Sequence, residues 1–482
     1  MNGTIKFGTG GWRAIIGDEF TKTNITILTQ AIAEYVLENR DESKELALVV
    51  GFDKRFLSKA AATWVSEVLV GNGIKAYLIN EEAPTPMTMF KIGDMNLEYG
   101  IQVTASHNAY EWNGIKFFID GGRDAVVEVT DELQERVSKL NEADVKAVNF
   151  RTCSEGDLVE IINPVNEYID RIMSLIDVDA IKRKGLKVLL DPMYGVSRIA
   201  LQALLINCRV RVDTIHDTHD MMFGGKVPSP TSANLQLLKD LVVKGEYDLG
   251  VATDGDADRI GIITEKGQYV HANEILALLY YYYLEYRDIK SPVVRNISTT
   301  HLLDRIAKHY GQECVEVNVG FKHIAQGMED SGAILGGESS GGIATKGHIR
   351  GKDGIYAAAL LIEMISKSNT SITKLLEEIY EKFGKLYMVE RNFRITEELR
   401  QTIKDKLFEK HEIPEYEFKV IKTSNKDGYK IYFENDCWIL VRFSGTEPVI
   451  RIYAEMESEV EAVAVCNKMQ KFLGISDLDR TE

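Results

Sequence analysis

A β-α-β unit recurs three times along this chain of 482 residues. In each unit, a short apolar run is followed by a helical stretch and then by a second apolar run. The first runs lie at residues 46–52, 186–190 and 292–297, and the second runs at 73–79, 210–215 and 313–317. Such alternation is typical of β-α-β units on a largely parallel sheet. The chain is therefore predicted to contain three related α/β domains.

Each unit then reaches a further short strand that ends in a polar loop. The three loops lie at residues 104–108, 254–259 and 336–342. The first offers a hydroxyl nucleophile, the second three carboxylates at alternate positions, and the third polar acceptors on a glycine frame. Ligands of α/β sheets bind outside the carboxyl ends of strands, so we expect the loops to share one cleft. Together they favour phosphoryl transfer to a hydroxylated small molecule.

The last hundred residues show a different pattern, with four apolar strands and a closing helix that predict a small α+β domain. Its loop at residues 442–448 offers a guanidinium, two hydroxyls and a glycine, a combination that suits a phosphate. The expected fold is α/β, with three related α/β domains of mixed, largely parallel sheets and a C-terminal α+β domain around a central cleft. The expected domains are residues 1–150, 151–265, 266–380 and 381–482.

The charge and cysteine content exclude several classes of function. A formal net charge of −16 argues against binding to nucleic acid or to an anionic membrane. The five cysteines are scattered and lack metal-ligand spacing, which favours a reducing compartment. Residues 1–8 form no apolar signal region, and the apolar stretch 275–284 is too short to span a bilayer. We expect a cytoplasmic protein, monomeric or homodimeric, that acts on small molecules.

The loop with Asp254, Asp256 and Asp258 can direct three carboxylates at one cation, and ligand sets made only of oxygen favour Mg²⁺. A solvated turn is the alternative. A calcium EF-hand also deserves a test, because Glu265 falls at the twelfth position of such a loop. However, Arg259 occupies the sixth position, where glycine is needed, and the flanking residues resemble strands. The EF-hand is therefore rejected.

Ser106 is the candidate nucleophile, with an ordinary turn serine as the alternative. Its neighbour His107 is badly placed for a Ser-His-Asp triad, whose members converge from different parts of a chain, and this argues against a hydrolase. Glu338 and Ser340 are candidates for ligand recognition, although residues of this type also cap helices after glycine turns.

Taken together, five motifs resemble those of the α-D-phosphohexomutase family, the phosphoglucomutase/phosphomannomutase enzymes. They are F-G-T-G-G-W-R at 7–13, T-A-S-H-N-A-Y-E-W-N-G-I-K at 104–116, D-G-D-A-D-R at 254–259, G-E-S-S-G at 337–341 and R-F-S-G-T-E-P at 442–448. The resemblance covers essentially the whole chain, in order and at the family's spacing.

The resemblance implies an isomerase of carbohydrate metabolism. Ser106 would carry a phosphoryl group bridged to Mg²⁺ on the three aspartates, and glucose 1,6-bisphosphate would serve as activator and intermediate. The implied catalytic residues are Ser106, Arg13, His107, Lys116 and Arg259, and the implied metal ligands are Ser106, Asp254, Asp256 and Asp258. The implied substrate-binding residues are Lys322, Glu338, Ser340, Arg442, Ser444, Gly445 and Thr446.

Three positions depart from the family pattern: Gly10 replaces an aspartate, Ala109 a proline, and Gly342 a histidine found in many phosphomannomutases and glucosamine mutases. The last departure, with Lys322 in Gly-Phe-Lys-His, favours interconversion of glucose 1-phosphate and glucose 6-phosphate. Phosphomannomutase or phosphopentomutase activity remains the alternative, and a non-catalytic sugar-phosphate-binding protein is the alternative from another class. A turning bisphosphate also predicts domain closure, with a hinge between Phe383 and Arg394.

Overall fold

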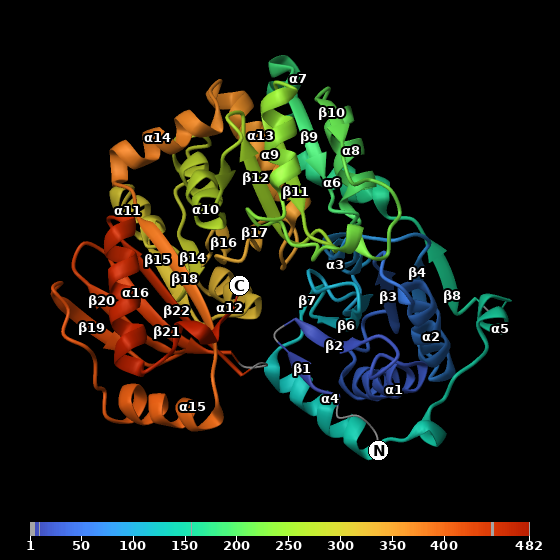
Figure 1. The fold of residues 1–482 in the computed structure, drawn as a ribbon. Helices are drawn as coiled ribbons and strands as arrows, with labels where there is room; N and C mark the ends of the chain where they lie inside the picture. Colours follow the sequence, from blue (N-terminus) through green and yellow to red (C-terminus); the bar gives the residue numbers. More distant parts are fainter. Residues whose placement is uncertain (1–4, 9, 156, 445–447, 482) are drawn as a thin grey trace. The chain divides into compact units, whose positions relative to one another are not determined.

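The computed structural model describes residues 5–8, 10–155, 157–444 and 448–481 of the chain (Figure 1). The chain folds into two compact units, each built from two separate stretches. Unit 1 comprises residues 1–275 and 334–374, and unit 2 comprises residues 276–333 and 375–482. Each unit is described by itself below.

The first sheet of unit 1 has eight strands and carries the Ser106 loop. Its order is β1 (Phe7–Gly8), β2 (Gly11–Ile15), β6 (Trp112–Ile119), β5 (Tyr99–Val103), β3 (Ala47–Phe52), β4 (Lys75–Ile79) and β8 (Val159–Ile162), with β7 (Arg123–Asp124) on β6. β3 is parallel to β4 and β5, whereas β6 is antiparallel to β5 and β2. Every residue of β3 is buried, as its apolar run predicts.

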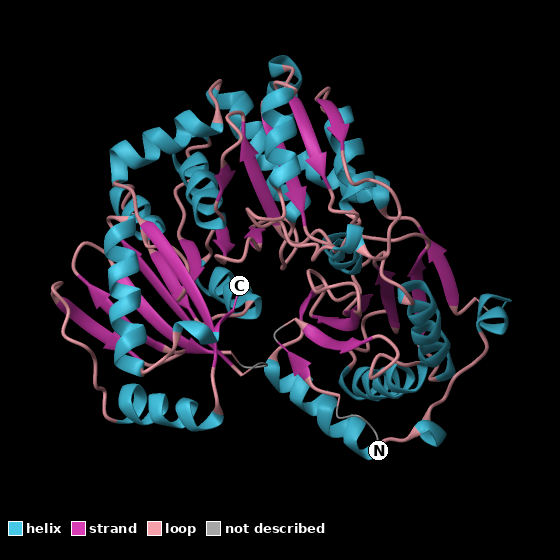
Figure 2. Ribbon diagram, in the orientation of Figure 1, coloured by secondary structure: helices cyan, strands magenta, loops and turns pink. Residues whose placement is uncertain are grey.

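Helices alternate with the strands of this sheet along the chain, and Figure 2 shows helices in cyan and strands in magenta. They are α1 (Lys22–Asn39), α2 (Ser58–Gly71), α3 (Thr85–Asp94), α4 (Val127–Lys139), the short η1 (Glu142–Asp144) and α5 (Phe150–Glu155). α1 and α2 pack against each other, and their apolar residues share one core with β3 and β5. This core holds the carboxyl ends of β3 and β5 in place, and the loops that follow these strands line the candidate site.

The second sheet of unit 1 carries the aspartate loop. Its order is β10 (Arg211–Thr214), β9 (Lys187–Asp191), β11 (Leu249–Thr253), β12 (Ile260–Thr264) and β13 (Tyr269–Val270). β11 runs parallel to β9 and pairs antiparallel with β12, so residues 254–259 are the turn of a hairpin between two fully buried strands. The accompanying helices are α6 (Val165–Leu175), α7 (Val178–Lys184), α8 (Ser197–Asn207), η2 (Phe223–Gly225) and α9 (Gln236–Lys244).

A later stretch of the chain completes unit 1. β16 (Leu335–Gly337) and β17 (Ile343–Thr345) form an antiparallel hairpin, and α13 (Gly354–Ser368) follows it. α13 contacts α7, α8, β11 and β12, and it buries most of its side chains. The second β-α-β unit is therefore covered by a helix that lies about a hundred residues further along the sequence.

Unit 2 begins within α10 (Ala272–Tyr281), which continues as the π-helical segment η3 (Tyr282–Tyr286). Residues 275–284 are all buried, as expected for an apolar stretch in a core helix. β14 (Val293–Asn296) pairs in parallel with β15 (Cys314–Val317). The helices are α11 (Leu302–His309), α12 (Phe321–Ser331) and α14 (Ile372–Phe383), which begins in unit 1 and ends in unit 2.

The C-terminal part of unit 2 is a six-stranded sheet. Its order is β19 (Val420–Ser424), β20 (Tyr429–Phe433), β21 (Trp438–Phe443), β22 (Val449–Met456), β18 (Tyr387–Arg394) and β23 (Arg480–Thr481), and neighbouring strands are antiparallel. The helical elements are α15 (Glu397–Ile403), the π-helical η4 (Lys404–Glu409), α16 (Glu459–Leu473) and η5 (Asp477–Asp479). α16 packs against β18 and β22. The fold class, with α/β sheets and a separate α+β domain at the C-terminus, is confirmed.

Charged side chains, of which Lys430 is fully buried, tie this sheet to the other part of unit 2. Lys430 of β20 has a fully buried side chain and donates to the carbonyl of Ile297 at 2.7 Å and to Glu316 at 2.8 Å. Arg305 of α11 donates to the carbonyl of Phe383 at 3.2 Å and pairs with Asp436 at 3.1 Å. A hinge between Phe383 and Arg394 stays a prediction. Movement of the C-terminal sheet about such a hinge would have to strain or break these contacts.

No helix among the described residues is long and apolar enough to cross a membrane.

Candidate active site

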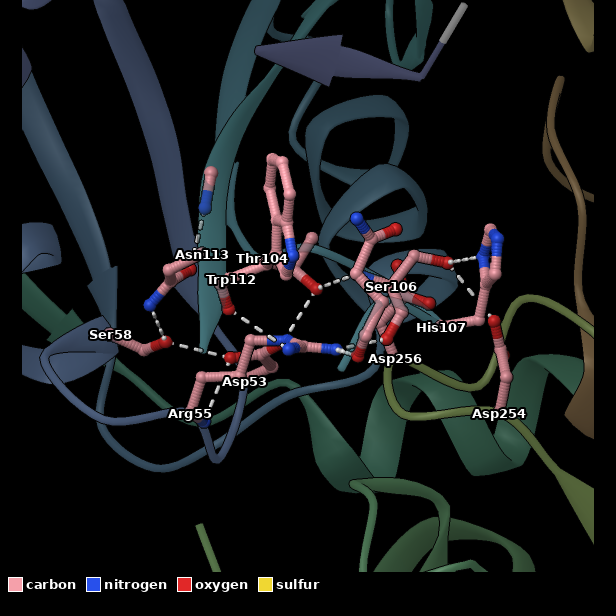
Figure 3. A network of polar contacts seen from close by, with 12 residues as sticks. Asp53, Arg55, Ser58, Thr104, Ser106, His107, Trp112, Asn113, Asp254 and Asp256 are labelled. Atoms are coloured by element: carbon pink, nitrogen blue, oxygen red, sulfur yellow. Dashed lines mark hydrogen bonds and ion pairs between the residues drawn. The ribbon is translucent and has the colours of Figure 1, made fainter. Parts of the chain in front are cut away.

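Ser106 lies in the loop that follows β5, directly beside the aspartate loop (Figure 3). Its side chain is buried, and its Oγ donates to Oδ2 of Asp254 at 3.0 Å. Its backbone N–H donates to Oγ1 of Thr104 at 2.8 Å. Ser106 has a φ of 52°, a left-handed conformation that costs a residue with a side chain free energy and is often found at functional sites. The fold thus holds a serine hydroxyl against a carboxylate from a different sheet.

Arg55 organises the Ser106 loop, and the sequence reasoning missed this role. Its guanidinium donates to the carbonyls of Ser106 at 2.6 Å and Asn108 at 2.7 Å, and also to those of Ala109 and Trp112. Its Nε pairs with Asp53 at 3.1 Å, and both side chains are fully buried. The available signal was the polar turn Asp-Lys-Arg after the buried strand β3, because such turns mark the carboxyl edge of a sheet.

The three aspartates form a compact cluster. One carboxylate oxygen from each of Asp254, Asp256 and Asp258 lies within 4.8 Å of the others, and all three residues are buried. Among the described residues, Oδ1 of Asp256 and Oδ1 of Asp258 have no hydrogen-bond partner. Buried acceptors are rarely left unsatisfied in proteins, and an oxygen-binding cation would satisfy them. The donor set therefore fits Mg²⁺.

Two lysines partly neutralise this cluster. Nζ of Lys116, on β6, lies 2.7 Å from Asp256 and 2.9 Å from Asp258. Nζ of Lys352, in the loop before α13, also lies 2.9 Å from Asp258. Burial alone would raise the pKa of Asp258, but Lys116 and Lys352 outweigh burial and hold it well below its usual range. Burial and the neighbouring aspartates instead raise the pKa of Asp254. Lys352 was not predicted, since one lysine between Gly351 and Asp353 in a loop is a weak signal.

The other predicted catalytic residues lie around this cluster in unit 1. Arg13 donates to Oδ1 of Asn108 at 2.6 Å. A Cβ at Gly10 would lie 2.9 Å from the Arg13 guanidinium, so the residue that departs from the family pattern is in contact with it. Nδ1 of His107 lies 3.4 Å from Oγ of Ser106, and burial, with Arg259 and Arg13, holds the pKa of His107 well below its ordinary value.

The aspartate loop and the predicted sugar loop are joined through the backbone. Arg259 forms a β-bridge with Gly342, and the N–H of Ile260 donates to the carbonyl of Gly341 at 3.3 Å. Glu338 is buried in the turn of the β16–β17 hairpin, whereas Ser340 is exposed at its tip. Unit 1 thus brings together the predicted nucleophile, metal ligands and sugar loop.

Unit 2 contains the remaining predicted binding residues. Lys322 lies in the first turn of α12, and Arg442 near the end of β21 pairs with Asp427 at 3.0 Å. The N–H of Ser444 donates to the carbonyl of Val449 at 2.8 Å. Gly445 and Thr446 lie outside the described residues.

Four family profiles match consecutive parts of the chain. They are described as Phosphoglucomutase/phosphomannomutase alpha/beta/alpha domain I at residues 4–144, domain II at 166–267, domain III at 271–383, and C-terminal domain at 392–471. The chain belongs to the phosphoglucomutase/phosphomannomutase family. It is therefore an enzyme of the intramolecular phosphotransferase class, and the resemblance inferred from the five motifs is confirmed.

Relatives within the phosphoglucomutase/phosphomannomutase family act on different sugars. The chain is 31% identical over 462 residues to the phosphoglucomutase/phosphomannomutase of Thermococcus kodakarensis, covering 95% of each. It is 29% identical to the phosphoglucosamine/phosphogalactosamine mutase of Sulfurisphaera tokodaii, covering 97% of this chain and 98% of that protein. A crystal structure from Thermus thermophilus, provisionally named a phosphomannomutase, has a TM-score of 0.84 at 26% identity and covers 98% of this chain and 100% of that one.

Proposed function

We propose that this enzyme interconverts glucose 1-phosphate and glucose 6-phosphate through phosphorylated Ser106 and a glucose 1,6-bisphosphate intermediate. The observation that carries the proposal is the buried contact of 3.0 Å between Oγ of Ser106 and Asp254 of the aspartate cluster. A hydroxyl so close to three carboxylates is poorly explained as a structural serine. It is well placed to exchange a phosphoryl group beside a bound cation.

The proposed reaction has two phosphoryl transfers. In the first, a sugar hydroxyl attacks the phosphorus on Ser106, the P–Oγ bond breaks, and a bisphosphate forms. The bisphosphate then turns so that its other phosphate faces Ser106. In the second transfer, Oγ of Ser106 attacks that phosphorus, the bond from phosphorus to the sugar oxygen breaks, and the sugar leaves as the isomer. In each transfer the attacking hydroxyl gives up a proton and the departing oxygen takes one up. Mg²⁺ bound by the three aspartates would offset negative charge on the transferring oxygens. His107, neutral because of its burial, can accept a proton near Oγ, while Lys116, Arg13 and Arg259 supply positive charge around it.

The preference for glucose is proposed from two sequence features. Lys322 stands in Gly-Phe-Lys-His, and Gly342 replaces a histidine that many phosphomannomutases and glucosamine mutases carry. Glu338 and Ser340 would bind sugar hydroxyls common to both substrate orientations, and Arg442 with Ser444, Gly445 and Thr446 would bind the phosphate that does not react. We also propose a cytoplasmic enzyme, monomeric or homodimeric, with the four domains divided at residues 150, 265 and 380.

A coupled mutase assay tests the proposed substrate. With Mg²⁺ and a trace of glucose 1,6-bisphosphate, we expect kcat/KM for glucose 1-phosphate to exceed those for mannose 1-phosphate, glucosamine 1-phosphate and ribose 1-phosphate by about tenfold or more. Preference for another sugar would retain the mechanism and reject the glucose assignment. If no sugar phosphate turns over but some bind in calorimetry, the chain is a sugar-phosphate-binding protein.

Removing one carboxylate from the cluster tests the metal assignment. We expect Asp256→Asn to weaken Mg²⁺ binding by at least about tenfold, because an anionic oxygen ligand is lost. Calorimetry of the protein treated with EDTA measures the dissociation constant without relying on activity. Asp131→Asn, at an exposed aspartate of α4, serves as the control and should bind Mg²⁺ like the parent protein. Equal affinity in the Asp256 and Asp131 variants would reject the site.

A further inference from the structure

The loop between β17 and α13 is fixed to α6, a helix on the connection between the two sheets of unit 1. Arg171 of α6 donates to the carbonyl of Gly347 at one end of this loop. One helical turn earlier, Oη of Tyr168 donates to Oδ2 of Asp353 at 2.7 Å at the other end. Lys352, which reaches Asp258, lies between these two anchors. The loop that carries Lys352 is therefore anchored at both ends to α6.

The anchor at Asp353 is a buried polar network of three side chains. Nε2 of His348 lies 2.7 Å from Oδ2 of Asp353, the same oxygen that accepts from Tyr168. The side chains of His348 and Asp353 are 1% and 3% exposed, and Tyr168 is fully buried. A carboxylate can only accept hydrogen bonds, so Nε2 of His348 carries the proton in this arrangement. Two donors thus fix one oxygen of Asp353 in a region without solvent.

The other oxygen of Asp353 fixes the backbone next to Lys352. Oδ1 accepts from the N–H groups of Ile355 and Tyr356 and so caps the N-terminus of α13. The N–H of Gly354 donates to the carbonyl of Ala257 in the aspartate loop at 3.1 Å. A Cβ at position 354 would lie 2.6 Å from the carbonyl of Arg259, so the two loops are in close contact. Asp353 thus fixes the backbone immediately after Lys352 and holds this loop against the aspartate loop.

We propose that Tyr168 and His348 are positioning residues, which act through Asp353 to hold the Lys352 ammonium against the aspartate cluster. The expected effect of these residues on turnover rests on the proposed function. Their expected effect on Mg²⁺ binding does not rest on it. Lys352 competes with a cation for Asp258. Releasing the lysine should therefore tighten Mg²⁺ binding while it slows phosphoryl transfer, which needs the positive charge beside the transferring group.

A double-mutant cycle between Tyr168→Phe and Lys352→Met tests the proposal. Tyr168→Phe removes one hydroxyl and leaves the ring in place, and we expect kcat to fall about tenfold with KM nearly unchanged, as for loss of a hydrogen bond to a buried carboxylate. Lys352→Met should lower kcat at least as much. In the Lys352→Met background, Tyr168→Phe should have no further effect, because the lysine that it positions is gone. His348→Gln should behave like Tyr168→Phe.

Mg²⁺ calorimetry provides the second readout. Lys352→Met should tighten binding several-fold, Tyr168→Phe should tighten it less, and the double variant should match Lys352→Met. Tyr77→Phe is the matched control, since Oη of Tyr77, on β4 next to the edge strand β8, also donates to a carboxylate, that of Glu45 at 2.9 Å. It should change neither readout.

Multiplicative losses of kcat in the double variant would overturn the proposal, as would a Tyr168→Phe enzyme that melts earlier but turns over normally. Equal losses from Tyr77→Phe would also overturn it. If the parent protein turns over no sugar phosphate, the proposed function fails, and the Mg²⁺ cycle alone decides the positioning role.

Discussion

Replacing Ser106 with alanine should reduce mutase turnover by at least about 10⁴-fold, the scale of loss when a covalent nucleophile is removed. The reason is specific to the site: Oγ of Ser106 contacts the aspartate cluster, at 3.0 Å from Oδ2 of Asp254. Without Oγ, the enzyme has no atom to which the phosphoryl group can be bonded between the two transfers. Binding of sugar phosphate should persist, because no predicted binding residue is changed.

The measurement combines turnover with the mass of the intact protein. After incubation with glucose 1,6-bisphosphate, the parent protein should gain one phosphoryl group, and the Ser106→Ala variant should gain none. Ser138→Ala is the control, because Ser138 is an exposed serine of α4. It should be phosphorylated and active like the parent. Full activity in Ser106→Ala would end the phosphoserine mechanism, even if the protein proved to be a mutase.

Replacing Arg55 with methionine should lower the free energy of unfolding of unit 1 by about 3–5 kcal/mol, because one partner of a buried ion pair is removed. Burial raises the pKa of Asp53 even with Arg55 beside it, so without Arg55 this carboxyl must be protonated or stay buried as an uncompensated charge. The carbonyls of Ser106 and Asn108 would also lose their donor. Displacement of the loop by about 1 Å would cost roughly 100-fold in turnover.

Urea unfolding, followed by circular dichroism, measures the loss of stability for Arg55→Met. Arg136→Met is the matched control, since Arg136 also forms ion pairs, with Glu38 and Glu132, but near the surface. It should cost less than about 1 kcal/mol. Arg55→Lys keeps the charge but not the planar set of donors, and it should recover part of the stability and little of the turnover. Equal stability of the Arg55→Met and Arg136→Met variants would show that Arg55 does not organise the loop.

The parts of the site that could be predicted from the sequence lie in short loops after apolar strands. Ser106 and the three aspartates were found because strand, polar turn and strand follow each other within a few residues. Arg55 and Lys352 were missed because each acts at a distance along the chain. Arg55 binds carbonyls more than fifty residues away, and Lys352 reaches Asp258 from the second stretch of unit 1, residues 334–374. One basic residue in a loop does not reveal which distant acceptors it meets.

The same distinction holds for the fold. The three β-α-β units and the C-terminal domain follow from local periodicity. The division into two compact units does not follow from local periodicity. It depends on which sheet is covered by each part of residues 266–380. Contacts of α13 with β11 and β12 accompany the assignment of residues 334–374 to unit 1, and they join residues about a hundred positions apart. Periodicity identifies a helix with an apolar face but not the surface that this face will cover.

Unit 1 is built from two separate stretches of sequence, and this affects when the site can be completed during synthesis of the chain. A ribosome makes the first sheet and the aspartate loop early, but α13, which covers β11 and β12, ends only at Ser368. Until that helix emerges, the apolar side of the second sheet is open to water or to other chains. Lys352 and the β16–β17 hairpin arrive at the same late stage, so a nascent chain stalled before this point would hold Ser106 and its aspartates with Lys116 alone to balance their charge.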